Sequence, residues 1–171
     1  MCLEPLNSPL RGPGSMDTEV PAVTPVLDLE KLFRAVRDSP QLFGCEVNGT
    51  LKRLSHSVFN DPGREPSVDR AGLRQGGPAD SRKSDSDGVV PLVACDVRAI
   101  KSVVSYDEKR RPVSHHFVNV EHDPLPDNHS HALVKTAPQL AGDGAFKRLK
   151  EALCRIAEHH GWAFKPGSLR G

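Results

Sequence analysis

Apolar residues recur at helical spacing near residue 30 and again near residue 150. After Asp28, which can cap a helix, four of them stand at i, i+3, i+4 and i+7: Leu29, Leu32, Phe33 and Val36. This spacing predicts a helix over residues 28–38. A second stripe predicts a helix over residues 144–160, ended by Gly161; its members are Phe146, Leu149, Leu153, Ile156 and Ala157.

Between these two segments the pattern alternates as it does in strands. Residues 50–59 favour a strand with Leu54, His56 and Val58 on one face, whereas a helix would place Arg53 beside His56. Further strands are expected over 89–95, 102–106, 113–121 and 131–135, with Pro91 confining the first to a sheet edge or to a strand start. The strands over 102–106 and 113–121 flank a polar turn and are typical of a hairpin. Together these elements predict an α+β fold, a small antiparallel sheet with helices packed on one face.

Three stretches lack this patterning. Residues 1–25 carry five prolines and are expected to form a disordered N-terminal tail. Residues 74–88, rich in Ser, Asp and Gly, favour a mobile loop, and residues 166–171 a C-terminal tail. The sequence therefore predicts one α+β domain over residues 26–165.

Charge and cysteine content indicate the setting of the protein. The formal net charge of +1 gives no overall attraction to nucleic acid or membrane. No run approaches the roughly 20 apolar residues of a membrane span, and residues 1–10 lack the features of a secretory leader. The four cysteines lie far apart in sequence, which favours free thiols over disulfides. We therefore expect a cytoplasmic protein without a membrane partner.

Histidines are concentrated in one part of the chain. Five of the eight fall within residues 115–131: His115, His116, His122, His129 and His131. His129 and His131 point the same way on an extended chain, and His116 or His122 could supply a third nitrogen, as in a catalytic zinc site with an open position. No HExxH motif and no paired cysteines accompany them. The alternative is a set of surface histidines on a hairpin and its loop.

A second arrangement of candidate residues needs no metal. Arg53, His56, the hydroxyl of Ser67 and His131 could line one cleft, in which two imidazoles share the acid and base roles of phosphodiester cleavage. The arginine would neutralise the charge that develops on phosphorus. Two prolines stiffen residues 123–128 and would thereby position His131. The alternative is that His56 is a core histidine without a chemical role.

Three segments between residues 50 and 135 resemble a set of small uncharacterised bacterial proteins. They are Arg53-Leu-Ser-His56, Pro66-Ser-Val-Asp-Arg70 and Asp123-Pro-Leu-Pro-Asp-Asn-His-Ser-His131-Ala132, which match R-x-x-H, S-V-D and D-P-x-P-x-N-x-x-H-A. The resemblance brings no established activity with it. It implies that six residues share one site: Arg53, His56, Ser67, Asp69, Asn128 and His131. Residues 80–87 depart from the pattern as an insertion.

These patterns leave two classes of function. The first is an enzyme with a histidine/arginine site that acts on a phosphodiester or nucleotide, as a toxin- or defence-type effector does. The second is a non-catalytic binding module or accessory subunit of a bacterial complex, with a protein, nucleic acid or nucleotide as partner. Basic residues 109–111 could contact phosphate or simply form a solvated hairpin tip. The chain has no Walker loop, GxGxxG motif or nucleophile elbow, which argues against NTPases, dehydrogenases and α/β-hydrolases.

Overall fold

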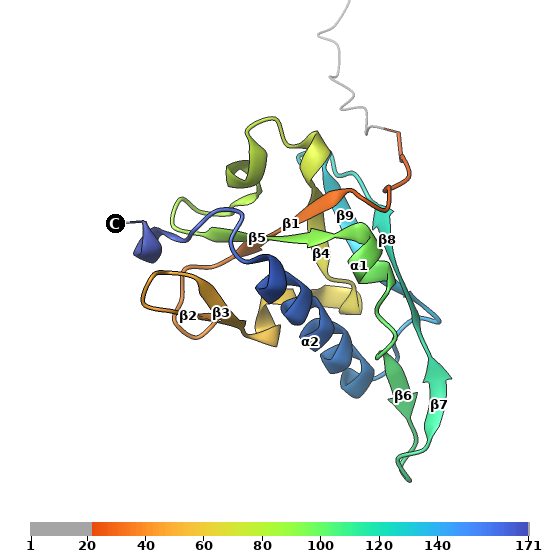
Figure 1. Cartoon of the computed structure of the whole chain (residues 1–171). Coiled ribbons are helices and arrows are strands. Elements are labelled where there is room, and N and C mark those ends of the chain that lie inside the picture. Colours follow the sequence, from red (N-terminus) through yellow and green to blue (C-terminus); the bar gives the residue numbers. More distant parts are fainter. Residues whose placement is uncertain (1–21, 171) are drawn as a thin grey trace, which may run out of the picture.

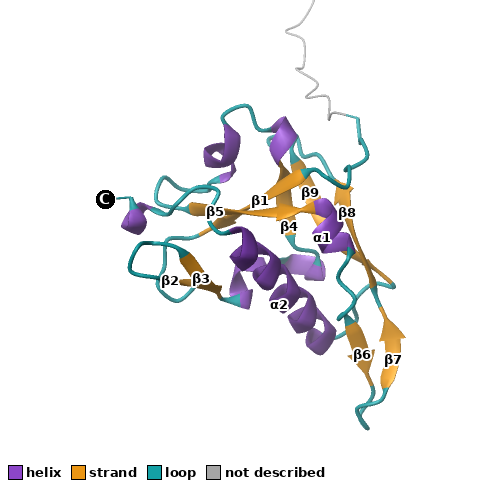
Figure 2. Cartoon of the chain, viewed as in Figure 1, coloured by secondary structure: helices purple, strands orange, loops and turns teal. Residues whose placement is uncertain are grey.

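The computed structural model describes residues 22–170 and has an α+β fold, in which helices pack on one face of an antiparallel sheet. Figure 1 labels its elements, and Figure 2 distinguishes helices from strands. The strands are β1 (Lys31–Val36), β2 (Phe43–Cys45), β3 (Leu51–Leu54), β4 (Ser67–Arg70), β5 (Gly88–Val93), β6 (Val104–Tyr106), β7 (Pro112–His115), β8 (Phe117–His122) and β9 (His131–Ala137). The helices are α1 (Ala94–Arg98) and α2 (Asp143–His160), and short 3-10 turns fill several connections.

Five strands form the main sheet in the order β5-β1-β4-β9-β8, with antiparallel neighbours throughout. Two separate two-stranded ribbons, β2–β3 and β6–β7, flank the sheet. Pro91 lies in β5, at the edge of the sheet, where its missing N–H costs no ladder hydrogen bond. The expected hairpin is confirmed as β6–β7.

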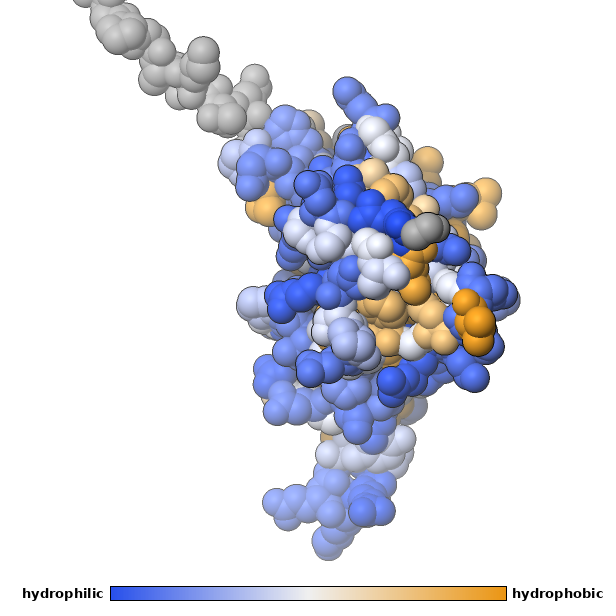
Figure 3. Space-filling view, turned by 90° about the vertical axis from the view of Figure 1, so that its left-hand side faces the viewer, coloured by the Kyte–Doolittle hydropathy of each residue, from blue (hydrophilic) through white to orange (hydrophobic). Residues whose placement is uncertain are grey.

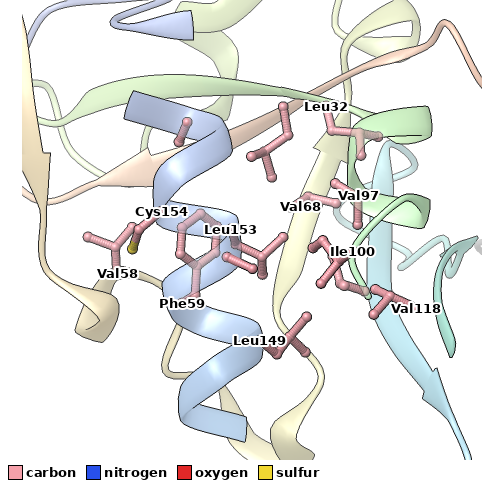
Figure 4. Packing of buried hydrophobic residues seen from close by; sticks show 14 of the residues in the cluster. Leu32, Val58, Phe59, Val68, Val97, Ile100, Val118, Leu149, Leu153 and Cys154 are labelled. Carbon is pink, nitrogen blue, oxygen red and sulfur yellow. The ribbon is translucent and has the colours of Figure 1, made fainter. Parts of the chain in front are cut away.

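Helix α2 covers one face of the sheet, as Figure 4 shows from close by. Its residues Leu149 and Leu153 are fully buried. Phe59, which ends the 3-10 helix His56–Phe59, is fully buried in the same cluster. From the sheet, Leu32, Val68, Ala132 and other alternate residues join this core. The predicted helix over residues 144–160 is therefore confirmed within one residue.

The opposite face of the sheet carries a row that includes two polar residues, Asp69 and His131. Phe33 pairs with Asp69 across β1 and β4, and Asp69 pairs with His131 across β4 and β9. Because side chains alternate along a strand, these three lie in one row on the face turned away from α2. This row is the framework on which the candidate site is built.

The predicted helix over residues 28–38 is wrong, because this segment contains the strand β1. Leu32 and Val36 face the core, while Phe33 is buried on the opposite face. A central strand covered on both faces carries apolar residues on both sides, and here their spacing imitates one helical stripe. Leu29, the first member of the supposed stripe, is 87% exposed.

Other expected elements need smaller corrections. Residues 50–59 split into β3 and a 3-10 helix, His56–Phe59, whose entry is capped by the hydroxyl of Ser55. Residues 113–121 likewise split into β7 and β8 around the buried His116. The central strand β4 was not predicted, since three of its four residues are polar or charged.

The ordered structure extends beyond the predicted domain limits at both ends. Thr24, placed in the N-terminal tail, donates its N–H to His122 Nδ1 at 3.0 Å. Ser168, placed in the C-terminal tail, donates its N–H to Asp38 Oδ2 at 2.7 Å. Residues 1–21 of the expected tail lie outside the described part of the chain. Residues 74–88 include a 3-10 helix, Gly77–Ser81, and their mobility stays a prediction.

None of the helices between residues 22 and 170 combines the length and the apolar character that crossing a bilayer requires.

Candidate functional site

A large polar groove of about 1030 Å³ runs over the face of the sheet that is turned away from α2. Its floor comes from β1 and β4, and its walls include the turn 81–87 and residues 125–131, from the loop before β9 and the first residue of β9. The polar and charged side chains of the lining are Arg34, Arg37, Asp38, Ser57, Ser67, Asp69, Arg74, Ser81, Arg82, Lys83, Ser84, Ser86, Asp87, Asp127, Asn128 and His131. Grooves of this size hold small ligands or a stretch of a polymer.

His131 is the titratable aromatic side chain of this groove. Its Nδ1 lies 2.7 Å from the backbone carbonyl oxygen of Asp123 and 3.3 Å from a carboxylate oxygen of the same residue. A carbonyl oxygen only accepts, so Nδ1 carries the proton and Nε2 is the basic nitrogen of the neutral ring. The side chain is 14% exposed, which leaves it accessible but held in place.

A hydrogen-bond network fastens the loop of His131 to the sheet. Asn128 Nδ2 donates to Asp69 Oδ1 at 2.8 Å, and Arg74 Nη2 lies 2.9 Å from the other carboxylate oxygen of Asp69. Arg74 Nη2 also donates to Asn128 Oδ1, which accepts from the Ser130 hydroxyl as well. The negative charge of Asp69 is thereby balanced by Arg74, and both of its carboxylate oxygens have a partner. Arg74 Nε is buried and has no hydrogen-bond partner within residues 22–170.

A second network closes the end of the groove around Arg34. The guanidinium donates to both carboxylate oxygens of Asp61, at 2.6 and 3.1 Å, and to the carbonyl of Val58. It also donates to the hydroxyl and the carbonyl of Ser67, at 2.8 and 2.7 Å. Ser67 therefore lines the groove as predicted, but its hydroxyl serves as an acceptor for Arg34. This bidentate ion pair joins residues 58–61 to β1, and the bonds to Ser67 extend the network to β4.

Two cations of the groove remain available to a ligand. Neither Arg37 nor Lys83 belongs to any ion pair formed among the described residues, and both are exposed. Arg82 instead lies over the Phe164 ring at 4.8 Å and donates to the carbonyls of its own turn. On the acidic side, Asp87 accepts from backbone and side chain of Ser84, whereas Asp127 is exposed. Asp38 and Asp87 are engaged by the neutral donors of Ser168 and Ser84, so the groove carries two cations and three carboxylates that belong to no ion pair among the described residues.

The structure brings only part of the predicted catalytic set together. Ser67 and His131 line the groove, while Arg53 and His56 are absent from its lining and are exposed. The reason lies in the topology: β3, which carries Arg53, belongs to the separate β2–β3 ribbon rather than to the main sheet. Of the six residues that the resemblance groups in one site, four line this groove: Ser67, Asp69, Asn128 and His131.

The predicted zinc ligands do not meet. His116 is buried between the carbonyl of Pro138 and the hydroxyl of Ser105, at 2.6 and 2.8 Å, so both of its nitrogens are occupied. His122 is likewise occupied, since its Nε2 donates to the carbonyl of His129 at 2.9 Å. His129 is exposed on the loop. Across the part of the chain that the structure describes, no three His, Cys, Asp or Glu side chains gather in a way that could hold a metal ion.

A second, smaller hollow of about 500 Å³ lies between α1 and α2. Its floor is made of alanine and isoleucine side chains, and His160 at its rim is engaged with Asp96 at 3.2 Å. It contains two histidines and one arginine but no row of residues comparable to that on the sheet. The polar groove is therefore the stronger candidate for chemistry.

Sequence reasoning missed the arginines and the lysine of the groove. Arg34 and Arg37 lie in a segment predicted to be helical, and Arg74 and Lys83 lie in one predicted to be a loop. The signal that could have found Arg74 was the S-V-D segment, because a carboxylate held inside a sheet needs a cationic partner. Arg34, Arg37 and Lys83 can be assigned to one groove only when the positions of β1 and of the turn 81–87 in the fold are known.

Comparisons with protein-family models, with curated proteins and with solved structures found no match to this chain. The chemistry of the site therefore rests on its own geometry.

Proposed function

We propose that this protein is an enzyme that acts on a phosphodiester or nucleotide bound in the polar groove, with His131 as its general base. The observation that carries the proposal is the placement of His131, whose Nδ1 is held by Asp123 so that the basic Nε2 remains for substrate. General bases of this kind are commonly histidines fixed by a hydrogen bond at the other ring nitrogen.

Two exposed cations of the groove support a phosphate-bearing substrate. Arg37 and Lys83 are exposed in the groove and engaged in no ion pair within residues 22–170. Cationic groups of this kind stabilise the negative charge that builds up on a phosphoryl group during displacement. Arg74 adds a buried N–H donor, Nε, that is without a partner in the described structure. In this scheme Nε2 of His131 takes the proton from an attacking hydroxyl or water, whose oxygen bonds to phosphorus as the P–O bond to the leaving oxygen breaks. The leaving oxygen takes a proton from water or from the imidazolium, and the cations hold the remaining phosphate oxygens.

Asp123 acts on this scheme as a positioning residue. Its carboxylate lies 3.3 Å from the nitrogen that carries the proton, so it favours the imidazolium formed after proton transfer. The carboxylate of Asp69 is not available for that task, because Arg74 and Asn128 occupy both of its oxygens. We further propose that the activity is that of a toxin- or defence-type effector.

Replacing His131 by glutamine tests the proposal. Purified protein is assayed on bis(p-nitrophenyl) phosphate, on 2′,3′-cyclic nucleotides and on short RNA and DNA oligonucleotides. We expect turnover of at least one of them, and a loss of about 10²- to 10⁴-fold in kcat for His131→Gln. The matched control is His129→Gln, which removes an exposed imidazole of the same loop and should keep the wild-type rate.

The same experiment separates the enzyme from the alternative, a non-catalytic binding module. A wild-type protein that binds these compounds in the groove without turning any of them over would refute catalysis and support the module. Equal rates for wild type and His131→Gln would also refute the assigned role of His131. Perturbation of the groove residues in NMR spectra on adding nucleotide shows whether binding takes place there.

A further inference from the structure

The β6–β7 hairpin projects from the body of the protein, as Figure 1 shows at the lower right. It pairs with no strand of the main sheet. Three large apolar side chains of the hairpin and of the adjoining strand β8 are exposed: Tyr106 at 46%, Val113 at 63% and Phe117 at 71%. Figure 3 shows the projecting lower end of the molecule as predominantly hydrophilic. A two-stranded ribbon that reaches into solvent contributes little to the core, so its exposed side chains are free to contact a partner.

The tip of the hairpin is organised to display two cations. The Asp107 carboxylate accepts from the Arg111 N–H and from Arg111 Nε, both at 2.8 Å. These bonds, first of all the one from the backbone of Arg111, lower the pKa of Asp107 and keep it ionised. Arg110 adopts a left-handed backbone conformation with φ 59°. Lys109 and Arg110 are exposed and form no ion pair with other described residues.

The root of the hairpin is firmly anchored. The buried His116 bridges Ser105 on β6 to the carbonyl of Pro138 at the end of β9. On α2, Arg148 lies over the Tyr106 ring at 4.6 Å and donates to the carbonyl of Val104. The hairpin is therefore held in a fixed direction.

Two cations without an ion pair, Lys109 and Arg110, stand at the tip of this arm. The whole chain has a net charge of only +1. The hairpin, residues 104–115, holds three basic and two acidic side chains: Lys109, Arg110 and Arg111 against Asp107 and Glu108. Because Arg111 pairs with Asp107, two cations face one carboxylate, Glu108, at the tip, while Arg148 of α2 adds a further cation against the root. A partner attracted to the arm would carry dense negative charge.

We propose that the β6–β7 hairpin is a DNA-binding arm that enters the major groove of a duplex. The major groove of B-form DNA, about 12 Å wide, admits a two-stranded ribbon. Lys109 and Arg110 contact the phosphates, and the exposed Tyr106 and Val113 face the apolar edges of bases and sugars. A-form RNA has a major groove too narrow for a ribbon, so the arm selects duplex DNA. This inference concerns binding by the hairpin and does not depend on catalysis in the groove.

Fluorescence anisotropy with a labelled 20-base-pair DNA duplex, titrated from 50 to 200 mM salt, tests the inference. The variant is Lys109→Ala with Arg110→Asn, because asparagine tolerates the left-handed backbone at position 110. Loss of two phosphate contacts should weaken binding roughly tenfold at low salt and reduce the slope of log K against log salt by about 2. The matched control, Lys52→Ala with Arg53→Ala, removes the same charges from the β2–β3 ribbon and should bind as the wild type does.

The outcomes distinguish this inference from the proposed function. His131→Gln should bind the duplex as tightly as the wild type does, whether or not the groove is catalytic. The inference is overturned by absence of duplex binding at 50 mM salt, or by a hairpin variant with unchanged affinity and salt slope. Tighter binding to single strands or to RNA duplexes would overturn it as well. Concentration-dependent self-association removed by Val113→Ser would assign the arm to protein contacts instead.

Discussion

Charged side chains inside this protein are each held by several partners. Arg70, with a side chain 9% exposed, donates to Glu30 at 2.6 Å and to backbone and side chain of Thr24. Arg34 is enclosed in the same way by Asp61 and by backbone carbonyls. Removing one partner of such a pair leaves a buried charge and costs about 3–5 kcal/mol, whereas the intact pair adds little net stability. These residues therefore determine where segments lie more than how stable the protein is.

The buried thiol of Cys154 makes the stability of the protein depend on alkaline pH. The residue is 5% exposed on the inner side of α2, and desolvation raises the pKa of its thiol from 9.0 to about 12. Between these two values the unfolded chain loses a proton that the folded chain keeps, so stability falls as pH rises. We expect the free energy of unfolding to fall by up to about 1.4 kcal/mol per pH unit from this group. Urea denaturation at pH 8 and pH 10.5 measures the change.

The variant Cys154→Ala isolates this contribution. It should be less stable than wild type at pH 8, because a small cavity replaces the sulfur. The difference from wild type should then shrink by pH 10.5, because the variant has no thiol to ionise. A difference that stays constant over this range would contradict the assignment. In the folded wild type the thiol should also resist alkylation at pH 8, in contrast to the partly exposed Cys45 and Cys95.

At the scale of elements, the loop between β8 and β9 depends on Asn128. Its side chain donates to Asp69 and accepts from Arg74 and from the hydroxyl of Ser130, a residue 2% exposed. Asn128→Ala removes all of these bonds at once and should destabilise the protein by about 1–3 kcal/mol. The amide of Asp123, which donates to the carbonyl of His131, should then exchange its hydrogen faster. Hydrogen-exchange mass spectrometry of residues 123–131 measures the effect.

The control for this prediction is Asp127→Ala in the same loop. Asp127 is exposed, so its loss should leave stability and exchange close to those of the wild type. Similar exchange in Asn128→Ala and Asp127→Ala would show that the network does not hold the loop. The D-P-x-P-x-N-x-x-H-A segment thereby acquires a physical meaning. Its asparagine fastens the loop, its histidine faces the groove, and its alanine, Ala132, is fully buried in the core.

Much of the element pattern could be predicted from the sequence, and the failures have physical causes. Helix α2 and the β6–β7 hairpin are governed by local periodicity and turn residues, so the sequence predicted them. The prediction for strand β1 was wrong because this strand is covered on both faces, which removes the alternation of apolar and polar residues that marks a strand. Strand β4 was missed because two of its buried residues, Asp69 and Arg70, are charged. Their burial depends on ion pairs with partners outside the strand.

The candidate site was predictable only in part, for a related reason. Ser67 and His131 were identified from residue type, and both line the groove. The other two residues of the predicted catalytic set, Arg53 and His56, do not line the groove. No local pattern indicates that β3 belongs to a separate ribbon. Arg37 and Lys83 stand far apart in sequence and meet only through tertiary structure. Long-range pairing thus decides which of several plausible polar residues share a site.

At the scale of the whole molecule, the C-terminal segment joins parts of the groove wall that are distant in sequence. Ser168 donates from its N–H and its hydroxyl to the Asp38 carboxylate, at 2.7 and 2.6 Å. Gly167 donates its N–H to the carbonyl of Ser86 at 2.7 Å, and Arg170 donates to the carbonyl of Asp85. Figure 1 shows this end of the chain beside the turn that precedes β5. The segment therefore supports the turn that carries Lys83.

Truncation after Lys165 should accordingly lower stability and damage the groove together. The loss of several hydrogen bonds, each worth roughly 1 kcal/mol, predicts a fall in melting temperature of several degrees for a domain of this size. The turn 81–87, without its support, should become more susceptible to limited proteolysis, and nucleotide binding in the groove should weaken. Removal of Gly171 alone is the control and should change none of these. An unchanged melting temperature in the longer truncation would show that the segment behaves as the tail the sequence predicts. Duplex binding by the β6–β7 hairpin should survive this truncation, because the hairpin is anchored by His116 and Arg148 instead.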